Sequence, residues 1–282
     1  MQSPKPVPGP TVNTDWLERH CSTNSIFIVD IRDSADYKES HIPHSVNIPF
    51  TSLAVEKNNL HLELPEKEDL FRLLGKAGVS ADSAIVVVNC TDSSFALADA
   101  ARAATTLLYA GITNVAVLNG GYNKWVKENR ETTAEIDKRN ETAYTGDINN
   151  NIFVTSDYVM ARIGTSIIVD NRTPDVYFGV VLEPFAMRIG HIPGARCLPA
   201  PWIFTDEGTY KDIAELREMA TGVVGSEKDS EIIFYCGVGG YASAWWYVLV
   251  RMLGYRNVKI YDGAAEEWTS IAELPMAHFI WE

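Results

Sequence analysis

Residues 231–251 read EIIFYCGVGGYASAWWYVLVR, and this stretch determines the fold that we expect for the chain. The apolar run Ile232–Tyr235 has the length of a buried strand, and the pattern predicts a helix over Ala244–Leu253. Cys236 and the glycines behind it fill the turn between the two. Backbone N–H groups in such a turn can converge on the sulfur, and the helix adds the positive end of its dipole. We therefore expect the pKa of the Cys236 thiol to lie below the free-thiol value of about 8.5. The amides expected to form this cradle belong to Gly237, Val238, Gly239, Gly240, Tyr241 and Ala242.

Three kinds of chemistry use a loop of this shape, and a purely structural cysteine is a fourth interpretation. Nucleotide-phosphate binding normally places a lysine in the loop, and the glycine spacing here matches neither glycine fingerprint. Hydrolysis of phosphate esters by a cysteine loop usually requires an arginine at the sixth position after the nucleophile, where this chain has Ala242. Sulfur transfer requires no arginine there, because the loop amides solvate a persulfide anion.

Composition limits the class of protein. With 282 residues, 46% of them hydrophobic, the chain is long enough for two domains that each bury a core. Its formal net charge of −13 argues against binding to nucleic acid or to anionic membrane surfaces. The apolar stretch Ala244–Val250 ends at Arg251 and is too short to span a bilayer, so we expect no membrane segment.

The cysteines are few and scattered, which fits neither a disulfide scaffold nor a zinc knuckle. They are Cys21, Cys90, Cys197 and Cys236. We expect no metal and no organic cofactor. The first ten residues are rich in proline and lack the apolar core of a signal peptide. The expected compartment is therefore the cytoplasm, with the periplasm as the alternative if a signal peptide was removed before Met1.

The order of motifs in the first half of the chain recurs in the second half, which indicates a tandem duplication. The paired landmarks are Asp30-Ile-Arg32 with Asp170-Asn-Arg172, His41-Ile-Pro with His191-Ile-Pro, Val86–Cys90 with Ile232–Cys236, and Asn119-Gly and Trp125 with Asp262-Gly and Trp268. Residues 131–150 are charged and polar and are predicted to be a linker between domains at 11–130 and 151–282. Strands alternate with helices in each half, so we expect two α/β domains with mainly parallel sheets flanked by helices. Other predicted elements are helices over Thr14–His20 and Phe95–Tyr109 and strands over Ser25–Ile31, Ile85–Asn89 and Val115–Leu118.

These repeated motifs resemble the tandem-domain rhodanese family of sulfurtransferases, over roughly Asn13 to Trp268. The loop from Cys236 to Ala242 matches that family's Cys-x-x-Gly-x-x-Ala pattern. The resemblance implies a thiosulfate sulfurtransferase-type enzyme with a catalytic C-terminal domain and a degenerate N-terminal copy. Cys90 is followed by Thr-Asp-Ser-Ser without a glycine, and Asp92 should raise the pKa of its thiol.

Substrate recognition departs from the family pattern. Relatives that prefer thiosulfate often carry Arg-Lys directly after the cysteine, where this chain has Gly237 and Val238. The mercaptopyruvate enzymes use an arginine at the position of Val176. Arg172 and Arg188 remain as candidates for binding an anion, with the alternative that Arg172 only pairs with Asp170. His41 is a further candidate, because the resemblance implies that an N-terminal histidine approaches the active loop; a structural corner before Ile-Pro is the alternative.

The sequence therefore predicts a double-displacement sulfur transfer with Cys236 as nucleophile. The donor would be thiosulfate or a mercapto acid, and the acceptor would be cyanide, a small thiol or a protein thiol such as that of a thioredoxin-like protein. The alternative is a persulfide carrier or redox-binding module that is loaded by a partner protein. The absence of cations beside the cysteine favours this alternative.

Overall fold

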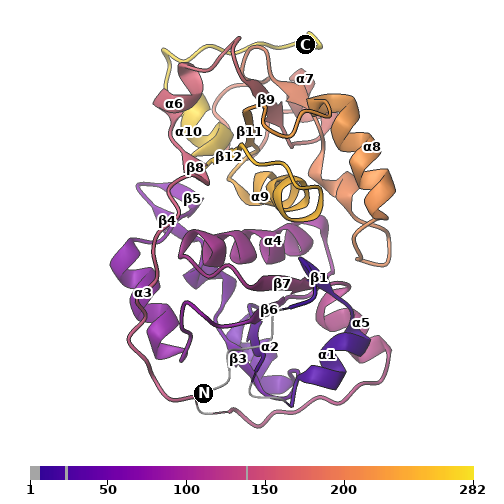
Figure 1. Cartoon of the computed structure of the whole chain (residues 1–282). Coiled ribbons are helices and arrows are strands. Elements are labelled where there is room, and N and C mark those ends of the chain that lie inside the picture. Colours follow the sequence, from indigo (N-terminus) through magenta and orange to yellow (C-terminus); the bar gives the residue numbers. More distant parts are fainter. Residues whose placement is uncertain (1–6, 23–24, 138) are drawn as a thin grey trace. The chain divides into compact units, whose positions relative to one another are not determined.

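The computed structural model describes residues 7–22, 25–137 and 139–282 and divides into two compact units (Figure 1). The N-terminal unit contains the chain up to Val55, Leu64–Asn149 and the short segment Phe204–Tyr210. The C-terminal unit contains Glu56–Glu63, Asn150–Ile203 and Lys211–Glu282. Each unit therefore includes one short segment from the other half of the chain.

The N-terminal unit is built on a parallel sheet with the strand order β1-β7-β6-β2-β3. Its strands are β1 (Thr11–Val12), β2 (Phe27–Asp30), β3 (Ser45–Asn47), β6 (Ile85–Val88) and β7 (Val115–Leu118). Its helices are α1 (Thr14–His20), α2 (Ser34–Glu39), the 3-10 turn η1 (Phe50–Ser52), α3 (Lys67–Lys76), α4 (Ser94–Tyr109) and α5 (Gly121–Lys127). Figure 1 shows α4 along one face of the sheet and α1 and α5 on the other.

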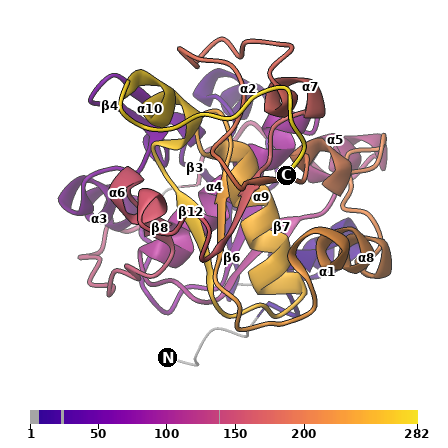
Figure 2. The same cartoon turned by 90° about the horizontal axis from the view of Figure 1, so that it is seen from above.

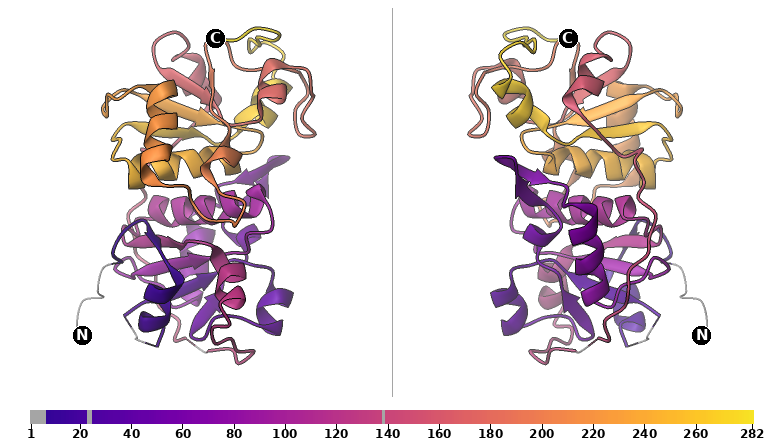
Figure 3. Two further views of the ribbon diagram at one scale, coloured as in Figure 1. Left: turned by 90° about the vertical axis from the view of Figure 1, so that its right-hand side faces the viewer. Right: turned by 90° about the vertical axis from the view of Figure 1, so that its left-hand side faces the viewer.

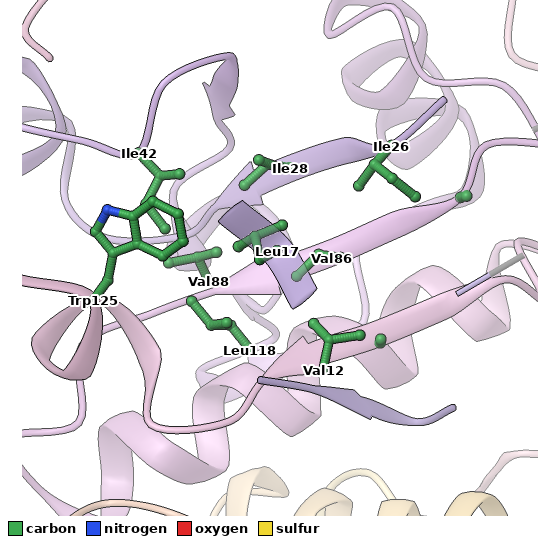
Figure 4. Close-up of a cluster of buried hydrophobic side chains, with 11 residues drawn as sticks. Val12, Leu17, Ile26, Ile28, Ile42, Val86, Val88, Leu118 and Trp125 are labelled. Atoms are coloured by element: carbon green, nitrogen blue, oxygen red, sulfur yellow. The ribbon is translucent and has the colours of Figure 1, made fainter. Parts of the chain in front are cut away.

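The core of this unit explains why its central strands are so apolar. All four residues of β6 are buried, because helices cover both faces of the sheet. Val86 and Val88 point into a cluster with Leu17 of α1 and Trp125 of α5, shown in Figure 4. The residues between them, Ile85 and Val87, belong to the opposite face, since side chains alternate along a strand.

The C-terminal unit repeats this architecture, with the strand order β10-β9-β11-β12-β8. Its strands are β8 (Phe153–Val154), β9 (Ile167–Asp170), β10 (Arg196–Cys197), β11 (Ile232–Tyr235) and β12 (Val258–Tyr261). Its helices are α6 (Ser156–Met160), α7 (Pro174–Phe178), the 3-10 turn η2 (Ala200–Ile203), α8 (Ile213–Val224), α9 (Gly240–Tyr247), the π-helical turn η3 (Val248–Met252) and α10 (Ala264–Ser270). The two-stranded sheet of β4 (Val55–Lys57) and β5 (Leu60–Glu63) contributes residues 56–63 to this unit.

The layers of the C-terminal unit are likewise helix, sheet and helix. Helix α9 packs against β11 and β12 on one face. On the other face, Ile233 and Tyr235 of β11 pack with Val159 of α6 and with Ala265 and Trp268 of α10. Figures 2 and 3 show the layers of each unit from other directions.

The predicted fold class, two α/β domains with mainly parallel sheets, is confirmed. Read from the opposite end, the strand order of the second sheet equals that of the first, as a tandem duplication requires. One local prediction is wrong: the helix expected from Ala244 already begins at Gly240, directly after the cysteine loop. No helix in the described part of the chain is long and apolar enough to cross a membrane.

Candidate active site

Cys236 directly follows β11, which is the central strand of its sheet. In parallel α/β sheets, ligands bind beyond the carboxyl ends of the strands, and Cys236 lies at this edge. The loop carbonyls are held from outside: Ala265 N donates to Cys236 O at 2.8 Å and Glu266 N donates to Gly237 O at 3.0 Å. The first turn of α10 thus binds two carbonyls of the loop, while three of the loop amides act on the sulfur.

Three backbone amides of the loop, out of the six named from the sequence, act on the Cys236 sulfur. The N–H of Gly239 donates to Cys236 Sγ at 3.1 Å. The backbone N–H groups of Ala242 and Val238 also stabilise the thiolate. Gly239 adopts the left-handed backbone conformation with φ of 90°, which a residue with a side chain would adopt only with strain. Gly237 is the first residue of the loop, where a Cβ would overlap the Glu183 carboxylate, and Gly240 is the first residue of α9.

The expectation of a lowered thiol pKa is wrong for this conformation. Burial raises the pKa of Cys236 to about 11, against the amides of Ala242, Val238 and Gly239, which lower it. The nearby Glu183 carboxylate raises it as well. Only 2% of the Cys236 surface is exposed, so the cost of desolvating a thiolate exceeds the stabilisation from the amides. Burial therefore favours the thiol over the thiolate in this conformation.

Glu183 is a site residue that the sequence did not reveal. It lies in the segment between Gly179 and Gly190, and its carboxylate packs on Gly237 so closely that a Cβ at Gly237 would overlap it. Arg172 Nη1 lies 3.4 Å from Glu183 Oε2. Burial raises the pKa of Glu183, while Arg172 acts to lower it. The Glu183 carboxyl group therefore lies against the residue that follows the nucleophile, within electrostatic range of the sulfur.

Arg172 makes the ion pair with Asp170 that the sequence offers as the alternative to anion binding. Its Nε and Nη2 bind the Asp170 carboxylate at 2.9 and 2.6 Å, and Nη2 also donates to Gly190 O at 2.7 Å. Its side chain is 2% exposed. With Glu183 on Nη1, the guanidinium already faces two carboxylates. Substrate binding by Arg172 stays a prediction, and these contacts do not favour it.

Arg188 and His41 are also bound to backbone carbonyls. Arg188 donates to four of them at 2.7 to 2.9 Å, those of Trp268, Thr269, Ile271 and Leu274. In the N-terminal unit, His41 Nδ1 lies 2.6 Å from Tyr37 O and Nε2 lies 3.1 Å from Glu135 O, and its ring stacks on Tyr37. His191 makes the matching contact with Tyr177 O at 2.8 Å. The roles of Arg188 and His41 in substrate binding stay predictions, since both make structural contacts here.

His61, which the sequence does not single out, is linked to the cysteine loop through Glu266. It belongs to β5, within the segment that joins the C-terminal unit. His61 Nδ1 lies 2.7 Å from Glu266 Oε1, and its ring packs against Phe185, with 5.1 Å between the ring centroids. Glu266 is the residue whose amide binds Gly237 O. No local sequence signal marks His61, because it lies 175 residues before Cys236 and outside every repeated motif.

Backbone amides act on two of the other cysteines as well: those of Asp92 and Cys90 lower the pKa of Cys90, and those of Cys21 and Ser22 lower the pKa of Cys21. Burial and then Asp92 raise the pKa of Cys90, which confirms the effect predicted for Asp92. Burial raises the pKa of Cys21 and raises that of Cys197 to about 12. Within residues 7–22, 25–137 and 139–282, no group of three or more His, Cys, Asp or Glu side chains is placed to hold a metal ion.

Comparison with known proteins agrees with the repeated architecture. A family model of the Rhodanese-like domain matches residues 13–128 and 155–271. A protein of Haloferax volcanii that carries the provisional name thiosulfate sulfurtransferase is 32% identical, over 94% of this chain and 95% of that protein. The Sulfur carrier protein TtuD of Thermus thermophilus is 29% identical, over 94% of this chain and 95% of that protein.

A solved structure shows the same fold. The anaerobic ergothioneine biosynthesis enzyme from Chlorobium limicola superimposes with a TM-score of 0.83 at 21% identity, over 96% of this chain and 70% of that chain. Both halves of the chain match one family model, and both units have the same strand order. The chain therefore belongs to the rhodanese family of sulfurtransferases and carries two rhodanese-like domains in tandem.

Proposed function

We propose that this chain transfers sulfane sulfur by double displacement through a persulfide on Cys236 in the C-terminal domain, and that the N-terminal domain is not catalytic. The observation that carries the proposal is the convergence of the Gly239, Val238 and Ala242 amides on one sulfur. Such a set of donors stabilises a negative charge on sulfur, both on the attacking thiolate and on the outer sulfur of a persulfide.

The two half-reactions balance without a cofactor. In the first, the Cys236 thiolate attacks the outer sulfur of thiosulfate, the S–S bond of the donor breaks, and sulfite leaves with the electron pair. In the second, an acceptor such as cyanide or a thiolate attacks the outer sulfur of the persulfide, and Cys236 leaves as a thiolate. A mercapto acid is the alternative donor, and a thiol of a small molecule or of a thioredoxin-like protein is the alternative acceptor.

The raised pKa of Cys236 adds one requirement to the first step. The thiol must lose its proton before it attacks, and burial disfavours the thiolate in the closed loop. The rate of this half-reaction should therefore rise with pH below the pKa of about 11.

Mass spectrometry of the intact protein tests the proposal. Incubation with thiosulfate or a mercapto acid should add about 32 Da to the Cys236 peptide, and cyanide should remove this mass. A Cys90→Ser variant should behave like the native chain. A mass increase on Cys90 in place of Cys236 would contradict the assignment.

A persulfide carrier is the second candidate function. In the C-terminal unit, Arg172 and Arg188, the two arginines proposed from the sequence, are held by carboxylates and carbonyls, which leaves them poorly placed to bind a small anionic donor. One relative is named a sulfur carrier. A carrier would gain the persulfide mass from a partner protein and not from thiosulfate. The free cysteines fit the cytoplasm, which we keep as the proposed compartment.

A further inference from the structure

The strongest feature outside the proposed chemistry is the loop of residues 180–189 that carries Glu183 to the cysteine. Its two ends are adjacent, because a Cβ at Gly179 would lie 3.2 Å from Gly190 N. Both glycines have left-handed backbone angles, with φ of 91° and 94°. The segment is thus a closed surface loop of the Ω type, whose ends meet and whose tip projects from the domain.

The loop is anchored on its second half. Arg188 binds carbonyls at the end of α10 and in the chain after it, and Met187 N donates to Thr269 Oγ1 at 2.9 Å. Ala186 N donates to Glu183 O at 3.0 Å, which forms a turn directly after the glutamate. These contacts hold the Glu183 side chain over Gly237 in a defined position.

We propose that Glu183 is a specificity-determining residue that selects against dianionic sulfur donors and favours donors of lower charge, such as a small-molecule hydropersulfide. This inference rests on the proposed sulfur transfer at Cys236 for its substrate. The Glu183 carboxylate packs on Gly237, the residue next to the nucleophile, and its charge acts on the Cys236 sulfur.

The charges around the loop support this selection. Asp170 and Glu183 both face Arg172, and one guanidinium neutralises only one of the two carboxylates. The loop itself, Gly237 to Ala242, contains no Lys or Arg. A dianion such as thiosulfate would therefore meet a net negative charge with only amides to offset it, whereas a neutral donor meets no repulsion.

Two alkylating reagents of nearly the same shape test the proposal without any sulfur chemistry. Iodoacetamide is neutral and iodoacetate is an anion, and both react with the Cys236 thiolate. The ratio of their labelling rates therefore cancels any change in the pKa of Cys236 and reports the charge met by the reagent. Peptide mapping gives the rate at Cys236 alone.

Three variants complete the experiment. Glu183→Gln removes the charge but keeps an oxygen that accepts from Arg172, and we expect the iodoacetamide-to-iodoacetate ratio to fall about tenfold, as one pKa unit of electrostatic interaction implies. Glu183→Asp keeps the charge and should stay close to the native ratio. Glu215→Gln removes an exposed carboxylate that pairs with Lys211, and serves as the control for net charge.

The same variants test whether Glu183 also selects the sulfur donor during turnover. In Glu183→Gln, kcat/KM for thiosulfate should rise about tenfold, mainly through KM, and the rate with a donor of lower charge, such as a small-molecule hydropersulfide, should change less. If the labelling ratio changes but no persulfide forms, charge selection by Glu183 would be confirmed and the proposed sulfur transfer would be refuted. Charge selection by Glu183 would be refuted by an unchanged ratio in Glu183→Gln. It would also be refuted if neither reagent labels Cys236 in any variant.

Discussion

Replacing Arg188 separates two roles that its position allows. From the sequence it is a candidate for binding an anionic donor, whereas in the structure its guanidinium donates to the carbonyls of Trp268, Thr269, Ile271 and Leu274. These carbonyls belong to the end of α10 and the chain after it. Arg188→Ala should therefore loosen this segment together with the loop that carries Glu183.

The expected magnitude follows from these contacts. A hydrogen bond from a charged donor contributes about 1.5–3 kcal/mol, and water replaces part of this when the side chain is removed. Four such bonds lead us to expect a loss of about 3–5 kcal/mol in the free energy of unfolding of the C-terminal unit. Arg188→Lys keeps the charge but loses the planar fork, so it should recover less than half of this loss.

Urea unfolding and hydrogen exchange of the peptide 268–277 measure the effect. Exchange in this peptide should be slowest in the native chain, intermediate in Arg188→Lys and fastest in Arg188→Ala. The rate at which iodoacetamide labels Cys236 should follow the same order. Donor binding by Arg188 predicts a different result. Unchanged unfolding and exchange, together with a raised KM for thiosulfate that lysine restores, would show that Arg188 binds the donor and would refute the anchoring role.

Three further predictions concern the cysteine loop. Cys236→Ser should abolish persulfide formation and leave the unfolding transition in place, because serine is a weak nucleophile at neutral pH; residual turnover above about a tenth of native would contradict the assignment. Gly237→Ala should displace the Glu183 carboxylate and so lower the iodoacetamide-to-iodoacetate ratio at Cys236, as Glu183→Gln does; an unaltered ratio would show that the two do not touch. The rate of Cys236 alkylation should rise with pH beyond pH 9, reach half of its maximum near the pKa of about 11 and level off above that pH. Because burial raises this pKa above the usual thiol value of 9.0, the thiol's contribution to stability is present below pH 9 and is lost as pH rises to about 11. A plateau of the rate near pH 8 would contradict the raised pKa.

The central elements of each domain could be predicted from the sequence because burial leaves a clear pattern. The strands Ile232–Tyr235 and Val115–Leu118 and the helix Thr14–His20 have the predicted bounds. A strand that is covered on both faces reads as an unbroken apolar run, and polar turns mark its ends. The edge strands β1, β8 and β10 have two residues each, which is too short for any such pattern.

The start of α9 was missed for a physical reason that belongs to the site. Gly240 has a low intrinsic helix propensity, so propensity alone places the start of the helix at Ala244. The structure begins the helix at Gly240 because Gly239, with φ of 90°, turns the chain directly into it and brings the Ala242 amide to the sulfur. The requirement for convergent amides thus overrides propensity in this turn.

The sign of the Cys236 pKa shift could not be predicted from the sequence. The glycines reveal the amides that lower the pKa, but nothing in the loop reveals how far the sulfur is buried. The structure shows that burial exceeds the effect of the amides. A glycine-rich loop therefore predicts where a sulfur anion is stabilised, and the surrounding packing decides at which pH the anion forms.

The negative charge near the cysteine loop also depends on packing that the sequence does not show. Asp170 lies two residues before Arg172, so the sequence already offers this pair as an alternative to substrate binding. Glu183 lies eleven residues beyond Arg172 in a segment without a motif, and only the folded loop brings it to both Arg172 and Gly237. Counting arginines near a motif therefore overestimates the positive charge that a substrate meets. In this chain the two carboxylates outnumber the one guanidinium, which is why the charge of the donor, more than its shape, should decide which sulfur compound the loop accepts.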